Sequence, residues 1–168
     1  MSDEKWLALL ALYAIGTIGR RSLVTGTALD TTKLVWPVKV PTGARSVISQ
    51  EYRPGPHGHP GVDIVVPAPA GKSPRYLSGG LVVAVADGIV TRAARGQRGW
   101  WVLLDHGDWA SGYLHLSSAL VGDGQRVEAG QTLGPMGADP LDPEQVVHLH
   151  IQISARGQLV DPARYLPA

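Results

Sequence analysis

Short apolar and β-branched runs recur along most of this chain, with glycine, proline or aspartate at the breaks between them. Between residues 46 and 154 nine runs have this form: Ser46–Ile48, Val62–Val66, Leu81–Val85, Ile89–Ala93, Trp101–Asp105, Gly112–Leu116, Gln125–Val127, Gln131–Gly134 and Val147–Ser154. Runs of this length that repeat every ~8–12 residues are typical of antiparallel sandwiches and barrels. The pattern therefore predicts an all-β fold with an antiparallel β-sandwich or barrel-like core.

Two short polar segments within this series look like tight turns. They are Ala86–Gly88 and Asp105–Asp108. An Asp-Gly or His-Gly pair tolerates the positive φ that two-residue hairpin loops need. We therefore expect a hairpin at each segment.

The first 35 residues follow a different pattern. Residues 6–18 are uncharged and rich in Leu and Ala, which predicts an apolar helix within residues 1–21. These thirteen residues are fewer than the ~20 of a membrane span, and the acidic start lacks the basic region of a signal peptide. The helix is therefore expected to dock on protein, in this chain or a partner, or to associate with a membrane. Residues 22–35 predict a linker, and residues 36–168 form the main domain.

Composition narrows the class of protein only modestly. A chain of 168 residues with 44% hydrophobic residues suits one domain with a proper core. The net charge of +1 gives no electrostatic reason to expect a nucleic-acid partner. The chain has no cysteine, so the core must hold the fold without disulfides, and a transition metal would need histidine and carboxylate ligands.

Histidines and one aspartate supply such ligands. His148 and His150 are alternate residues of a predicted strand and would face the same side, although an isolated pair of this kind is weak evidence. His59 and Asp63 flank a Pro-Gly bend, and imidazole and carboxylate are ordinary zinc ligands. An aspartate among valines and isoleucine is costly to bury unless it is paired or bound to a metal. His59, Asp63 and one histidine of the pair therefore form a candidate metal site.

The number of ligands bears on the kind of site. Three protein ligands leave the fourth tetrahedral position of zinc open, as in catalytic rather than structural sites. His115 and the other histidine of the pair are then available for proton transfer or for stabilising an oxyanion.

Together these segments resemble the lysostaphin-type (LytM-like) zinc endopeptidases, which cut peptide bonds in bacterial peptidoglycan. The resemblance runs from about Trp36 to the end of the chain. The matching motifs, in family order, are His59-Pro60-Gly61-Val62-Asp63, Ala86–Val90, Leu104–Gly107, Tyr113–Ser117, Val127–Gly134, His148-Leu149-His150 and Val160-Asp161-Pro162. Seven motifs in order make a far more specific signal than any one of them.

The resemblance implies roles for five residues. His59, Asp63 and His150 would bind one Zn²⁺ per chain, and His115 and His148 would flank the metal as catalytic histidines. The implied fold is an antiparallel core of the duplicated hybrid motif type. The implied substrates are stem or cross-bridge peptides of peptidoglycan, with the protein outside the cytoplasm, in the cell envelope or secreted, or carried on a phage virion.

The chain departs from the family pattern around the last histidine pair. A longer, acidic, proline-containing segment, Ala138–Val147, precedes it, and Ile151-Gln152 follow where the family has an aromatic residue and a glutamate. We expect this to change one wall of the substrate groove. We expect His57 at the rim of that groove, and a structural role for His106 in its turn.

Three alternatives to a cellular wall hydrolase remain. One is a non-catalytic scaffold of the same fold that recruits or activates another cell-wall hydrolase. Another is a virion component in which the peptidase domain is anchored by the N-terminal helix. The third, a phosphocarrier of the sugar-transport type, would have no use for Asp63 and the further histidines.

Overall fold

The computed structural model describes residues 34–68, 79–142 and 146–167. The helix expected within residues 1–21 and most of the linker lie outside these ranges. No helix within the described ranges is long and apolar enough to cross a membrane.

The described chain is almost entirely β-structure. Its strands are β1 (Val38–Lys39), β2 (Val47–Gln50), β3 (Val62–Val65), β4 (Leu81–Val83), β5 (Gly88–Gly96), β6 (Gly99–Asp105), β7 (Trp109–Leu116), β8 (Arg126–Val127), β9 (Thr132–Pro135), β10 (Leu149–Ala155) and β11 (Gln158–Val160). A short 3₁₀ turn, η3 (Pro162–Arg164), follows. The all-β prediction is confirmed, and each of the nine expected runs overlaps a strand. β1 and β11 were not expected.

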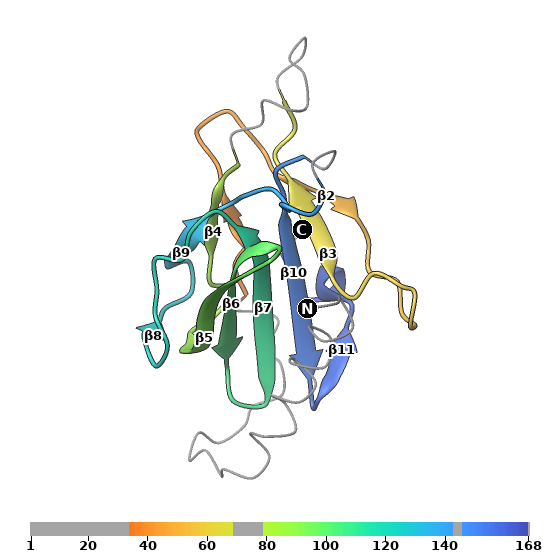
Figure 1. The fold of residues 1–168 in the computed structure, drawn as a ribbon. Helices are drawn as coiled ribbons and strands as arrows, with labels where there is room; N and C mark the ends of the chain where they lie inside the picture. The colour runs from red at the N-terminus through yellow and green to blue at the C-terminus, as the bar shows by residue number, and fades with distance from the viewer. Residues whose placement is uncertain (1–33, 69–78, 143–145, 168) are drawn as a thin grey trace.

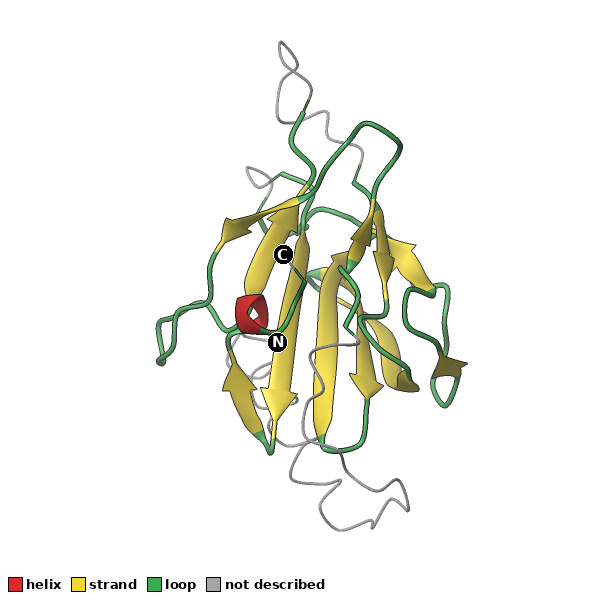
Figure 2. Cartoon of the chain, turned by 180° about the vertical axis from the view of Figure 1, so that it is seen from behind, coloured by secondary structure: helices red, strands yellow, loops and turns green. Residues whose placement is uncertain are grey.

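The strands form two antiparallel sheets (Figures 1 and 2). The smaller sheet has the order β1-β4-β9, and the larger has the order β2-β3-β10-β7-β6-β5-β8, with β11 also paired to β10. In Figure 1, β7 and β10 lie side by side in the middle of the larger sheet, with β3 next to β10. Three segments that are far apart in the sequence are thus neighbours at the centre of the fold.

The main core fills the space between the two sheets. Leu149, Ile151 and Ile153 of β10 are fully buried there, together with Val82 of β4 and Leu133 of β9. Because side chains alternate along a strand, the even-numbered residues of β10 face away from this core. Because Leu149, Ile151 and Ile153 are buried in the core, His150 and Gln152 lie on the opposite face of the larger sheet.

One of the two expected hairpins is wrong. Asp105–Asp108 does connect the paired strands β6 and β7, and Gly107 has φ +97° as that turn needs. Ala86–Gly88 instead carries the chain from β4 in the smaller sheet to β5 in the larger one, so its flanking strands do not pair. An Asp-Gly signal marks a turn, but it does not say whether the strands on each side share a sheet.

A buried polar chain ties these two turns together, and His106 has the structural role expected for it. His106 Nδ1 lies 2.7 Å from the carbonyl oxygen of Asp87, and its Nε2 lies 2.8 Å from Ser111 Oγ. A carbonyl only accepts, so Nδ1 carries the proton and Nε2 accepts from Ser111. Ser111 Oγ is 3.0 Å from the hydroxyl of Tyr113, which accepts from Val85 N–H at 2.9 Å. Burial lowers the pKa of His106 to about 4, which keeps the ring in this neutral form.

Two buried serines allow the contribution of this chain to be measured. Ser111→Ala should reduce the free energy of unfolding by about 1–3 kcal/mol, because it leaves buried partners without a hydrogen bond. Ser154, on the neighbouring strand β10, is similarly buried, but its hydroxyl has no hydrogen-bond partner within the described chain. Ser154→Ala is therefore the matched control, with little or no loss. Urea unfolding of both variants measures the difference, and equal losses would contradict a stabilising role for the chain.

Candidate metal and catalytic site

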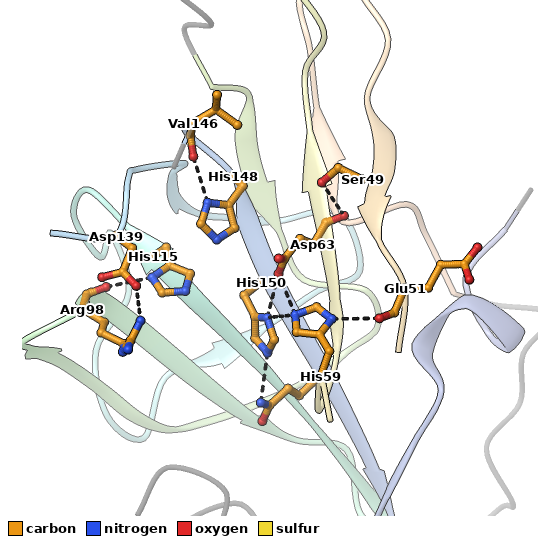
Figure 3. A network of polar contacts seen from close by, with 11 residues as sticks. Ser49, Glu51, His59, Asp63, Arg98, His115, Asp139, Val146, His148 and His150 are labelled. Carbon is orange, nitrogen blue, oxygen red and sulfur yellow. Dashed lines mark hydrogen bonds and ion pairs between the residues drawn. The ribbon is translucent and has the colours of Figure 1, made fainter. Parts of the chain in front are cut away.

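Three adjacent strands bring the predicted ligands to one place. Asp63 on β3 is directly opposite His150 on β10, and His150 is opposite Leu114 on β7. His59 precedes β3 and is held by an isolated bridge to Arg53. Asp63 and His150 therefore share the face of the larger sheet that points away from the main core, and His59 reaches the same place from the loop (Figure 3).

The bend between His59 and Asp63 needs the glycine that the motif contains. A Cβ at Gly61 would lie 2.2 Å from the carbonyl oxygen of Ile151 and 2.9 Å from Nε2 of His150. Neither the strand backbone nor the buried ring has room to move away. Gly61 thus allows the loop to approach β10 closely enough for His59 to reach His150.

The donor atoms of His59, Asp63 and His150 converge. His59 Nε2 is 3.2 Å from Asp63 Oδ1 and 3.0 Å from His150 Nδ1, and His150 Nδ1 is 2.7 Å from Asp63 Oδ1. Two imidazole nitrogens and one carboxylate oxygen form a ligand set that suits zinc. Ligands at ~2.0–2.2 Å from one ion need only a small outward adjustment of these atoms. The three residues therefore form a candidate metal site, and the groups present fit the ion.

Electrostatics favour a positive charge at this point. Burial alone would raise the pKa of the Asp63 carboxyl, but hydrogen bonds from His150 and His59 outweigh burial and hold that pKa well below its usual range. Burial alone would lower the pKa of His59, but its hydrogen bond to Asp63 and the charge of that carboxylate raise it. Asp63 is thus a buried carboxylate that needs a cation or hydrogen-bond donors beside it.

Groups behind two of the ligands fix their orientation. The carbonyl oxygen of Glu51 accepts from His59 Nδ1 at 2.9 Å. The neutral ring therefore has its lone pair on Nε2, facing the cluster, and Nε2 donates to Asp63 only when the ring is protonated. With its amide nitrogen turned toward Asp63, Gln50 donates to Oδ2 at 2.7 Å and accepts from Arg53 at 3.1 Å. One oxygen of Asp63 is thereby held while the other faces the histidines.

His115 and His148 lie beside this cluster (Figure 3). Their ring centroids are 4.6 Å apart, and the ring of His115 is 6.1 Å from that of His150. The Nδ1 atom of each ring lies within hydrogen-bonding distance of a backbone carbonyl, at 3.0 Å from Arg98 for His115 and 2.9 Å from Val146 for His148. Since a carbonyl only accepts, both rings carry a proton on Nδ1 and keep Nε2 for another partner.

A β-bulge brings His115 to this face. Between the pairs Trp100–Leu116 and Val102–Tyr113, two residues of β7 stand opposite one residue of β6. His115 has φ +63°, in the left-handed region that few residues other than glycine adopt. Strict alternation would point His115 into the core with Tyr113, and the bulge turns it outward instead. Backbone strain of this kind is found at functional sites.

Burial sets the protonation state of His115. Burial, followed by the charge of the neighbouring His148, lowers the pKa of His115 to about 4. At neutral pH the ring is therefore uncharged, and its Nε2 is able to accept a proton.

An ion pair supports the wall beside His115. Arg98, in the turn between β5 and β6, contacts the carboxylate of Asp139 through Nη1. The carboxylate of Asp139 is almost completely buried and also accepts from the backbone N–H of Leu141 at 2.9 Å. Asp139 belongs to the segment Ala138–Val147, and the carbonyl oxygen of Arg98 accepts from His115 Nδ1. The ion pair therefore connects this segment to the backbone that orients His115.

The structure brings all five predicted site residues together. His57 is exposed in its loop, and His106 belongs to the core network described above. Sequence reasoning missed the contacts of Gln50 with Asp63 and of Gln152 with His150, and it missed the Arg98–Asp139 pair. Alternation along β10 offered a signal for one glutamine, because Gln152 lies two residues after His150. No sequence signal joins Arg98 to Asp139.

Two named bacterial proteins are similar to this chain in sequence. The outer membrane antigenic lipoprotein B of Haemophilus influenzae is 38% identical over 92 residues, which cover 53% of this chain and 22% of that protein. The murein hydrolase activator NlpD of Escherichia coli is 36% identical over 92 residues, which cover 53% of this chain and 24% of that protein. The matched segment, about half of this chain, therefore covers about a quarter of the length of each of these two relatives.

Solved structures and a family model complete the comparison. The crystal structure of a zinc-containing peptidase from Vibrio cholerae is similar with a TM-score of 0.58 and 26% identity, over 75% of this chain and 37% of that one. The model of peptidase family M23 matches residues 57–162, a segment that includes every predicted ligand and catalytic residue. The match extends over more than half of the sequence, and the chain belongs to peptidase family M23.

Proposed function

We propose that this chain is a zinc-dependent endopeptidase that hydrolyses peptide bonds in bacterial peptidoglycan. The observation that carries the proposal is the convergence of the donor atoms of His59, Asp63 and His150, within 4.8 Å of one another, beside two further histidines. A domain that had lost catalysis would have no need to keep all five groups in this arrangement.

The proposed chemistry divides between the ion and the protein. A zinc ion held by His59, Asp63 and His150 would lower the pKa of a coordinated water to about 7 and so supply a nucleophile at neutral pH. His115 and His148 each present Nε2 on the same side of the sheet. We assign one of them to accept the proton of the water and pass it to the departing amine, and the other to stabilise the oxyanion.

The relatives support a location and a substrate class. One is named as an outer membrane lipoprotein and another as an activator of murein hydrolases. Peptidoglycan lies outside the cytoplasm, so we place this chain in the cell envelope, which these names favour over a phage virion. Its partners would be the stem or cross-bridge peptides of the wall.

The names of the relatives favour a second function more directly than the first. A murein hydrolase activator acts through another enzyme, and a domain of this kind would recruit or stimulate that enzyme rather than cut the wall itself. Comparison alone thus points to activation, whereas the arrangement of side chains points to catalysis.

Peptidoglycan digestion tests the proposed catalytic function. The whole chain, loaded with Zn²⁺, should release new peptide amine ends from purified peptidoglycan, and a chelator should abolish the release until zinc is restored. Mass spectrometry of the products identifies the bond. A folded, zinc-loaded chain that releases nothing from several wall chemistries would refute the endopeptidase.

Single substitutions test the division of roles. His150→Ala should lose zinc and activity together, because it removes a ligand. His115→Ala should keep zinc and lower turnover by about 10²–10⁴-fold, as expected for loss of a group that transfers a proton. The exposed His57→Ala is the matched control and should keep both properties. Zinc analysis of the purified variants decides, and a zinc-free His115→Ala chain would overturn the assignment.

The same variant separates the two functions. A purified murein hydrolase is assayed on peptidoglycan with and without this chain or its His115→Ala variant. An activator should stimulate that hydrolase equally in both forms, because its effect does not depend on proton transfer at His115. Cleavage that requires His115 and no second enzyme would identify the chain itself as the hydrolase.

A further inference from the structure

The ring of His150 has a second buried neighbour, the amide of Gln152. Gln152 lies two residues further along β10 on the same face, and only 3% of its surface is exposed. Its Nε2 is 3.0 Å from Nε2 of His150. Its Oε1 is buried and has no hydrogen-bond partner within the described part of the chain. The amide nitrogen of Gln152 therefore has a hydrogen-bond partner, the candidate ligand His150, whereas the amide oxygen has none among the described residues.

The unsatisfied oxygen draws attention to the orientation of the Gln152 amide, which has two alternatives related by a half turn. A buried acceptor without a donor costs about 1–3 kcal/mol. A half turn about the Cγ–Cδ bond exchanges the amide nitrogen and oxygen and places Oε1 where Nε2 now faces His150. The amide nitrogen can hydrogen-bond to His150 Nε2 when that atom has no proton, and the amide oxygen can do so when it carries one.

The proton position on His150 in turn depends on the cation. In this structure His150 Nδ1 is 2.7 Å from Asp63 Oδ1, so Nδ1 carries the proton and Nε2 accepts from the amide of Gln152. A cation bound at Nδ1 would need the lone pair of that nitrogen, so the ring proton would have to be on Nε2 instead. An N–H at Nε2 needs an acceptor, and Oε1 of Gln152 is the acceptor that the half turn supplies.

We propose that Gln152 is a positioning residue for the metal, whose side-chain oxygen accepts from Nε2–H of His150 and directs Nδ1 toward the ion. This inference rests on the proposed metal site. Packing supports it, because a Cβ at Gly61 would lie 2.9 Å from His150 Nε2 and 3.0 Å from Gln152 Cγ. The ring and the stem of the glutamine are therefore closely packed against Gly61, and the proposal requires a turn of the amide head alone.

Zinc affinity measures the contribution of Gln152. Partners that orient a metal-binding histidine typically account for 10–100-fold in affinity. Gln152→Met keeps the length of the side chain and removes the acceptor, so it should weaken zinc binding by about that factor. Gln152→Glu keeps an acceptor and should bind zinc at least as tightly as the wild type. Ser154→Ala, the next residue on the same face, is the matched control and should change nothing.

The experiment is a competition titration of the whole chain against a chromogenic zinc chelator, combined with long-range ¹H–¹⁵N spectra of the histidine rings. The expected zinc-loaded wild type has a proton on Nε2 of His150 and the metal on Nδ1. Metal-free melting curves establish that each variant is folded.

Each result decides the inference. Equal zinc affinity in the wild type and Gln152→Met, or a zinc-loaded His150 with its proton on Nδ1, would overturn the role of Gln152 and leave the metal site standing. A wild type that binds no zinc would overturn both. If Gln152→Met does not fold, the ring spectra and Gln152→Glu decide, because weaker binding by Gln152→Glu contradicts the proposal.

Discussion

The pairing of β10 with β3 on one side and β7 on the other is the constraint on which the site depends. It sets His150 opposite Asp63 and Leu114. A slip of one residue would turn the histidines into the core. Burial of Leu149, Ile151 and Ile153 prevents that slip, since each fully buried side chain contributes about 1.5–3 kcal/mol. Hydrophobic burial on one face of the sheet therefore fixes the metal-binding geometry on the other.

Charge explains why this face is suited to a cation. Asp63 is removed from water, and its charge is compensated by hydrogen bonds from Gln50 and from histidines that themselves have alternative partners. The Glu51 and Val146 carbonyls hold His59 and His148 in defined tautomers. Side chains that are already oriented before an ion or substrate binds need no reorganisation during the reaction, which lowers the activation free energy. The same arrangement is compatible with membership of a family whose curated relatives include activators, because their names describe whole proteins of which the matched segment makes up only about a quarter.

The sequence was sufficient for the fold class, for most strands and for the five residues that the structure brings together. The sequence predicts the alternation around Leu149 and His150 and the bend at Pro60-Gly61 because both are patterns among residues close together in the chain. Whether Asp63 was buried could not be decided, because it depends on the register between strands. The Ala86–Gly88 turn was assigned to a hairpin because sheet membership is not a local property. The bulge at His115 and the Arg98–Asp139 pair arise from contacts between distant segments and leave no pattern in the chain.

The left-handed backbone at His115 bears on how such a domain changes over generations. Holding a side chain with a Cβ in this conformation costs about 1–2 kcal/mol, and glycine is free of that cost. A mutation of His115 to glycine would thus remove the proposed proton-transfer group and relieve strain in one step. Retaining the histidine requires selection for what it does, and without that selection stability would favour its loss. A change from a hydrolase to a non-catalytic binding domain would then increase folding stability at this position, and the reverse change would decrease it.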